Sequence, residues 1–212
     1  MIVSEPKPYL RLDDEPVMMF EDIDASLTYS YSDYLNWLFP ERVELIKGKV
    51  FKMSPAPSSL HQEISTNILV AIANFLKHQP FKVYAAPFDV RFPKESKADK
   101  DVYTVLQPDI CVICDKSKLD YRGCIGAPDL IVEIVSPGNN RKELHNKYRV
   151  YEEFGVKEYW VVSQSRQTIL IYTLNERGKF CPSQIYTLGE KISSSVLPGF
   201  ELALDDVFGD LG

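Results

Sequence analysis

The spacing of apolar residues along the chain changes between a helical period and a strand-like one, and this pattern predicts both helices and strands. Apolar residues that share one helical face predict helices over residues 28–39 and 58–78. Pro40 ends the first of them. A third helix of about sixteen residues is expected to open after Ser136-Pro-Gly-Asn-Asn and to end at Gly155.

Short runs rich in β-branched and aromatic residues predict strands around these helices. The run at 129–135 is apolar enough to be buried on both faces of a sheet. Strands that alternate with helices indicate an α/β (α+β) fold with a mixed β-sheet flanked by helices. We expect residues 1–26 to be extended or poorly ordered and 27–212 to form one domain. The other predicted strands cover 42–53 (a hairpin turning at Lys47-Gly48), 81–85, 87–92, 109–114, 158–163, 168–174 and 184–188.

The composition is that of a globular protein with a sizeable core, since 45% of the residues are hydrophobic and 25% are charged. Four cysteines in 212 residues do not make a disulfide framework. The N-terminal stretch lacks the pattern of a signal peptide, and no run approaches the roughly 20 apolar residues of a membrane span. These features predict a cytoplasmic protein without a membrane partner.

The net charge of −6 weighs against a protein that coats nucleic acid non-specifically, because such binding relies on clustered Lys and Arg. It leaves room for a local cationic patch. It also suits a carboxylate site that holds a divalent metal ion.

Glu133 stands in the middle of the apolar run Ile-Val-Glu-Ile-Val, where an ionised group is costly unless it is paired. A salt bridge or backbone donors could satisfy it, and a functional site is the other interpretation. Asp109 and Asp129 each follow a proline at the head of an apolar strand. Asp129 shares a strand with Glu133 but lies roughly 13 Å away along it. If the strand of Asp109 lies beside that of Glu133, these two side chains can converge on one ion, whereas Asp129 would orient its own loop.

A Pro-Asp before one strand and a Glu on the next resemble the PD-(D/E)XK nuclease superfamily, although Val135 stands where that motif has its lysine. A wider set of blocks resembles, from about residue 28 to 205, a restriction-endonuclease-like family described as a domain of unknown function, a divergent branch of that superfamily. The blocks are Val43-Glu-Leu-Ile-Lys-Gly-Lys-Val, Met53-Ser-Pro-Ala-Pro with His61, Gln107-Pro-Asp, Ala127-Pro-Asp-Leu-Ile-Val-Glu-Ile-Val-Ser-Pro, and Lys147 with Tyr151 and Gly155-Val-Lys-Glu-Tyr-Trp.

The resemblance implies a catalytic role for Lys147, which matches a helical lysine of the family. Glu143, Lys147 and Tyr151 share one helical face, so Lys147 could supply the cation that is missing at position 135. The alternative is a surface ion pair between Glu143 and Lys147. Glu143, where the family has Asp, and Ser136 are further candidates near the substrate.

The resemblance also implies an acid early in the chain, and Glu44 matches it as a third metal ligand; the alternative is an outward-facing strand residue. His61 could orient a phosphate or a carboxylate, or cap its helix. Asp89 and Arg91 point to one face of a strand, so an ion pair and a metal contact are both open.

The implied activity is metal-dependent hydrolysis of a phosphodiester, with DNA as the expected substrate. Asp109 and Glu133, with Glu44, would hold Mg²⁺ or Mn²⁺, and Lys147 would add positive charge near the phosphate. The basic residues that could contact the substrate, or simply face solvent, are Arg91, Lys94, Lys97, Lys100, Arg141 and Lys142.

Two other functions stay open at this point. The fold could persist as an inactive module for interaction or nucleic-acid sensing. A zinc site at Cys111-x-x-Cys114 is disfavoured, because odd spacing on a strand sends the thiols to opposite faces. The aromatic stretch 159–186 could supply a homodimer interface or fill the chain's own core.

Overall fold

The computed structural model describes residues 19–53, 57–136 and 141–209, and for residues 141 and 142 only the backbone. The chain divides into two compact units. The first comprises Met1–Met53 and Arg91–Leu106, and the second Ser54–Val90 and Gln107–Gly212. Most of the segment 1–26, which is expected to be extended or poorly ordered, lies outside the described residues. The expectation that 27–212 form one domain stays a prediction.

The first unit is built on the predicted hairpin, β1 (Val43–Ile46) and β2 (Lys49–Lys52), which pair antiparallel. Lys47 and Gly48 both have positive φ, 52° and 75°, as a tight hairpin turn of two residues requires. A Cβ at Gly48 would also lie 2.2 Å from Thr28 Cγ2, so glycine is needed there. β5 (Val105–Leu106) pairs with β1 on its other side.

The helix predicted over 28–39 is wrong in length, because α1 spans only Tyr31–Tyr34. Ser30 and Asp33 form a capping box at its start. Trp37 lies 5.5–5.7 Å, between ring centroids, from three neighbouring rings, and this packing takes the place of further helical turns. The rings are those of Tyr29, Tyr34 and Phe39. The same unit also contains two short 3₁₀ helices, η1 (Phe20–Asp22) and η2 (Asp99–Asp101).

The second unit contains the predicted mixed sheet, six strands in the order β12-β11-β10-β9-β6-β3. β9 and β10 run parallel and every other neighbouring pair runs antiparallel. The strands are β3 (Lys82–Ala85), β6 (Ile110–Ile113), β9 (Leu130–Val135), β10 (Glu158–Ser163), β11 (Thr168–Leu174) and β12 (Phe180–Tyr186).

The sequence pattern predicts two strands imperfectly and does not indicate several short elements. The run 87–92 forms only β4 (Val90–Arg91), and the last sheet strand begins at Phe180 rather than at 184. Gly178 has a φ of 67° and allows the chain to turn back earlier than the apolar pattern suggests. The further elements are η3 (Lys116–Lys118), β7 (Leu119–Asp120), β8 (Gly123–Ile125), β13 (Lys191–Ser193), β14 (Glu201–Ala203) and α4 (Leu204–Phe208).

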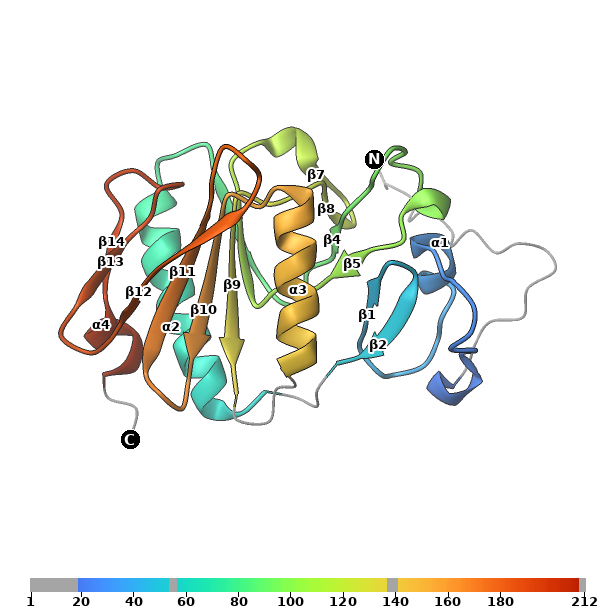
Figure 1. Ribbon diagram of the computed structural model, residues 1–212, viewed down its shortest axis with the longest axis horizontal. Helices are drawn as coiled ribbons and strands as arrows, with labels where there is room; N and C mark the ends of the chain where they lie inside the picture. Colours follow the sequence, from blue (N-terminus) through green and yellow to red (C-terminus); the bar gives the residue numbers. More distant parts are fainter. Residues whose placement is uncertain (1–18, 54–56, 137–140, 210–212) are drawn as a thin grey trace, which may run out of the picture. The chain divides into compact units, whose positions relative to one another are not determined.

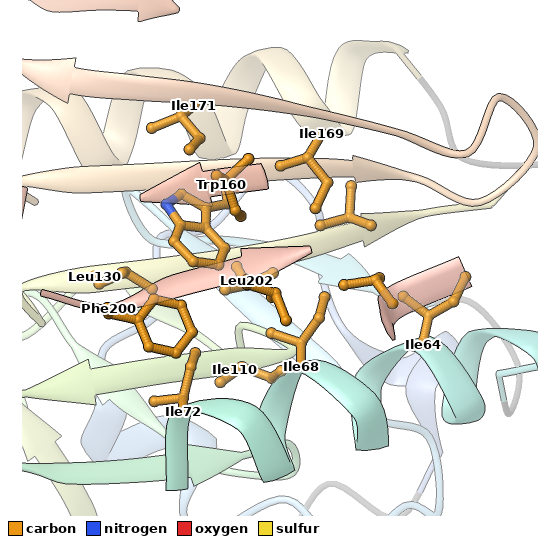
Figure 2. Close-up of a cluster of buried hydrophobic side chains, with 14 of the residues drawn as sticks. Ile64, Ile68, Ile72, Ile110, Leu130, Trp160, Ile169, Ile171, Phe200 and Leu202 are labelled. Atoms are coloured by element: carbon orange, nitrogen blue, oxygen red, sulfur yellow. The ribbon is translucent and has the colours of Figure 1, made fainter. Parts of the chain in front are cut away.

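Helices α2 (Ser59–Leu76) and α3 (Arg141–Phe154) lie on opposite faces of this sheet, as the alternation of strands and helices predicts (Figure 1). The α2 face holds the main core, where isoleucines of α2 at helical spacing pack against β6, β9 and β10 (Figure 2). Successive strand residues face opposite ways, so Val132 and Ile134 belong to this core and Glu133 faces α3. Within the described ranges, no helix is both long and apolar enough to cross a membrane.

A buried carboxylate, Glu158, joins the C-terminal segment to the sheet. Glu158 is 1% exposed, and its Oε1 accepts a hydrogen bond of 2.7 Å from Trp160 Nε1. Its Oε2 accepts one from the Ser195 amide at 2.7 Å and another from the Ser195 hydroxyl. The buried charge is therefore satisfied by three donors.

Candidate active site

Asp109 and Glu133 lie on neighbouring strands, as the sequence predicts. β6 and β9 pair antiparallel with Ile110 opposite Val132, and one step further in this register sets Asp109 opposite Glu133. Opposite residues of such a pair have Cβ atoms about 4.5–5.5 Å apart and share a face. Asp109 Oδ2 also accepts a hydrogen bond of 2.7 Å from the Ile134 amide, so its carboxylate is held against β9.

Lys147 reaches the acid pair from α3. Its Nζ lies 3.1 Å from Glu133 Oε1 and 3.2 Å from Oε2, and the lysine is 4% exposed. Tyr151, one turn later on the same helical face, donates a hydrogen bond of 2.5 Å to Glu133 Oε1. The alternative of a surface pair between Glu143 and Lys147 is wrong, because Lys147 is buried and bonded to Glu133.

His61, at the start of α2, contacts the other acid. Its Nε2 lies 3.4 Å from Asp109 Oδ2, and this contact raises the pKa of His61 above its ordinary value although burial opposes the shift. Ser58 caps α2 by accepting a hydrogen bond from the His61 amide. The side chain of His61 is therefore placed to orient the carboxylate of Asp109. The side chain that caps α2 is that of Ser58, not that of His61.

Asp129, at the other end of β9, orients its own loop as expected. Its Oδ2 accepts a hydrogen bond of 2.8 Å from the Cys114 amide, and its Oδ1 lies 2.7 Å from Lys157 Nζ. Burial alone would raise the pKa of Asp129, but the bonds from Lys157 and Cys114 outweigh it and hold the pKa below its usual 3.8.

We expect Asp129→Asn to lower the free energy of unfolding by about 1 kcal/mol at neutral pH, since it weakens a pair with a mostly exposed lysine. Because the folded pKa of Asp129 is depressed, its stabilisation is complete above the unfolded pKa near 3.8 and disappears as the pH falls through the folded pKa. Urea unfolding of both proteins across this range measures the difference. If the difference in unfolding free energy between wild type and Asp129→Asn stays constant down to the lowest pH, the pKa of Asp129 is not depressed by these bonds.

The other predicted residues lie in several places. Glu44 lies in β1 of the first unit and is 3% exposed, so the alternative of an outward-facing strand residue is wrong; its metal role stays a prediction. Asp89 Oδ1 accepts a hydrogen bond of 2.9 Å from Gln107 Nε2. Arg91 Nη1 lies 3.8 Å from Asp99 Oδ1, and its guanidinium lies over the ring of Tyr31.

Ser136 follows β9 and bonds Gln164 Oε1 at 3.2 Å, and Glu143 lies in the first turn of α3. Roles for Ser136, Glu143, Asp89 and Arg91 stay predictions. The side chains of Arg141 and Lys142 lie outside the described residues.

The cysteines do not support a zinc site. Cys111 is buried, and burial with the nearby Asp129 carboxylate raises the pKa of the Cys114 thiol to about 11. Since zinc binds the thiolate, such a thiol is a poor ligand. In the parts of the chain that the structure describes, no group of three or more His, Cys, Asp and Glu residues is arranged to hold a metal ion.

Two tyrosines of this site are not singled out by the sequence. Tyr151 stands out there as part of a family block and as a neighbour of Lys147 on the helix, but nothing in the pattern indicates its hydrogen bond to Glu133. Tyr159 belongs to the block Gly155-Val-Lys-Glu-Tyr-Trp, but an aromatic residue in a buried strand is ordinary core material, so the sequence assigns it no role at the site. In the structure the pKa of its hydroxyl is raised well above the ordinary value by burial and by the charge of Glu133.

Comparisons with known proteins agree with this fold. A crystal structure described as that of "a putative nuclease belonging to DUF820 from Anabaena variabilis ATCC 29413" superposes with a TM-score of 0.65. It is 20% identical in sequence, and the match covers 85% of this chain and 97% of that one. The "Uncharacterized protein slr1290" of Synechocystis sp. (strain ATCC 27184 / PCC 6803 / Kazusa) is 25% identical over 152 residues, 70% of this chain and 76% of that protein.

A family model described as "Uma2: Putative restriction endonuclease" matches residues 31–205, which include every predicted site residue. The match spans both strands of the acid pair and the helix that carries Lys147. The chain therefore belongs to the Uma2 family.

Proposed function

We propose that the protein is a metal-dependent nuclease that hydrolyses phosphodiester bonds of nucleic acid, with DNA as the substrate. The observation that carries the proposal is the arrangement of a half-buried Asp109 with the buried Glu133 and Lys147 on adjoining elements. The family description, and the Anabaena protein that is described as "a putative nuclease", support the same reaction. A cytoplasmic location and a homodimer remain predictions from the sequence.

The donor set fits Mg²⁺ or Mn²⁺. Mg²⁺ prefers oxygen ligands and is commonly held by one or two carboxylates, with waters and substrate phosphate completing its shell. Asp109 and Glu133 supply two carboxylates on one face of the sheet. Such a metal ion, when bound, lowers the pKa of a bound water and stabilises charge on the phosphate. Glu44 belongs to the other compact unit, and its role as a third ligand stays a prediction from the sequence.

The chain's own residues would position these carboxylates and add charge. Lys147 compensates the charge of Glu133, and its ammonium would stabilise the negative charge that grows on the attacked phosphate. Tyr151 and His61 fix the orientations of Glu133 and Asp109. Such fixed groups raise the rate because they need little reorganisation during the reaction.

The test is cleavage of labelled single- and double-stranded DNA and of RNA by the full chain, in buffers with Mg²⁺, Mn²⁺ or EDTA. We expect metal-dependent cleavage that falls by about 100-fold or more in Asp109→Asn and in Glu133→Gln, since each removes a charge that would hold the metal. Gel electrophoresis of the products measures the rate.

Asp129→Asn is the matched control, because Asp129 is also a buried carboxylate of the β9 segment but binds Lys157 instead of the candidate site. This variant should cleave at the wild-type rate. Circular dichroism verifies that all three variants are folded. Equal cleavage by wild type and both site variants, or no cleavage under any metal, would refute the nuclease proposal and leave the inactive interaction module as the better account.

A further inference from the structure

Beside the acid pair, a pocket of about 350 Å³ opens between α3 and the sheet of the second unit. Its volume falls within the range of about 300–1,000 Å³ that small-ligand sites have. The residues that line it come from one face of α3 and from two neighbouring strands, β10 and β11. They are Leu144, His145, Tyr148, Tyr159, Val161 and Tyr172.

Three of the six lining residues are tyrosines. Tyr159 and Tyr172 are cross-strand partners, and their rings stack with centroids 5.9 Å apart and planes 20° apart. The ring of Tyr148 meets Tyr172 edge-on at 5.0 Å from the α3 side. Tyr148 and Tyr172 are partly exposed, so the pocket offers aromatic surface of the kind on which another planar ring stacks.

Within the described part of the chain, the buried hydroxyl of Tyr159, in the wall of this pocket, is unsatisfied. Tyr159 is 1% exposed, and among the described residues its hydroxyl has no hydrogen-bond partner. A buried hydroxyl without a partner costs free energy, so such a group in a native fold calls for an explanation. A ligand with a polar edge would satisfy it.

The pocket adjoins the candidate site, and one of its lining residues, His145, is bonded to an arginine. The ring of Tyr151, which bonds Glu133, lies 5.1 Å from that of Tyr159. At the exposed side, Arg149 Nε donates a hydrogen bond of 3.0 Å to His145 Nε2. An aromatic pocket that adjoins a candidate phosphate-cleaving site, with a guanidinium bonded to one of its lining residues, matches the chemistry of a nucleotide, with its planar base and charged backbone.

We infer that this pocket binds an unpaired nucleobase of the substrate strand, next to the position of cleavage. The inference rests on the proposed nuclease function and deepens it. The base would lie against the partly exposed rings of Tyr148 and Tyr172, and a polar atom on its edge would bond the hydroxyl of Tyr159. A base inside a duplex is stacked and paired, so the preferred substrate is a single strand or a locally unpaired nucleotide.

The experiment measures binding without cleavage, by fluorescence anisotropy of a labelled single-stranded oligonucleotide added to the full chain in EDTA. Tyr148→Ala should weaken binding by about 5- to 100-fold, the usual effect of losing one base–aromatic stack. Tyr159→Phe removes only the hydroxyl and should weaken binding by about 2- to 10-fold. The wild type should bind the same strand with abasic sites, and the duplex, more weakly than the intact single strand.

Tyr121→Ala is the matched control, since Tyr121 is a 77%-exposed tyrosine of the same unit outside the pocket, and it should bind like the wild type. Tyr159→Phe keeps the ring and the packing, so it remains informative if Tyr148→Ala is unstable. Unchanged binding in Tyr159→Phe together with equal affinity for intact and abasic strands, or no binding at all, overturns the pocket. If the pocket is overturned in this way and the protein still cleaves nucleic acid, the nuclease proposal stands without the pocket. If binding depends on the bases but no cleavage is found, the pocket stands and the nuclease proposal fails.

Discussion

Lys147→Met is expected to lower the free energy of unfolding by about 3–5 kcal/mol, because it leaves the buried Glu133 carboxylate without its cation. Methionine keeps the length and much of the volume of the lysine, so packing around α3 changes little. The cost therefore reports the uncompensated charge. Urea unfolding at neutral pH, followed by circular dichroism, measures it.

The double variant Glu133→Gln/Lys147→Met is the control for this prediction. The glutamine introduced at position 133 carries no charge and can still accept the hydrogen bond from Tyr151, so more than half of the lost stability should return. If the single and double variants are equally destabilised, the loss comes from packing of the lysine stem. In that case the ion pair does not explain the stability of the site.

Trp160→Ala is expected to cost about 3–5 kcal/mol of unfolding free energy, the usual range for removing a large aromatic side chain from a core. Trp160 is fully buried at the centre of the α2 face, and its ring stacks on Phe200 with centroids 6.2 Å apart (Figure 2). The substitution leaves a cavity and also removes the donor that bonds Glu158 Oε1. Chemical denaturation measures the loss.

Trp160→Phe separates these two contributions, because it keeps an aromatic ring but removes the indole N–H. It should lose only about 1–3 kcal/mol, from the smaller ring and the weakened satisfaction of Glu158. An alanine variant no worse than the phenylalanine variant would show that the core collapses around the missing ring. The cavity argument would then fail.

The regular elements of the second unit are predictable because their patterns are local. α2 has apolar residues at helical spacing with Ser58 before it, and β10 and β11 have the predicted bounds. The adjacency of Asp109 and Glu133 also follows from sequence, since two apolar strands each carry one acid. Lys147 is a candidate from its helical position and a family resemblance, and the structure places its ammonium against Glu133.

The remaining features depend on packing between distant segments, which residue patterns do not encode. Glu158 is an ordinary strand-end residue in the sequence, and only the fold brings Ser195, 37 residues later, onto its carboxylate. α1 ends at Tyr34, well before Pro40, and the ring of Trp37 packs on Tyr29 and Tyr34. The unbonded hydroxyl of Tyr159 likewise arises only where α3 and β10 meet.

The hydrogen bond from the Ile134 amide to Asp109 ties the chemistry of the site to strand alignment. A slip of β9 by one residue against β6 would turn Glu133 toward the isoleucines of α2 and carry the amide out of reach of Asp109. Misaligned molecules would thus lose core burial and the acid pair together.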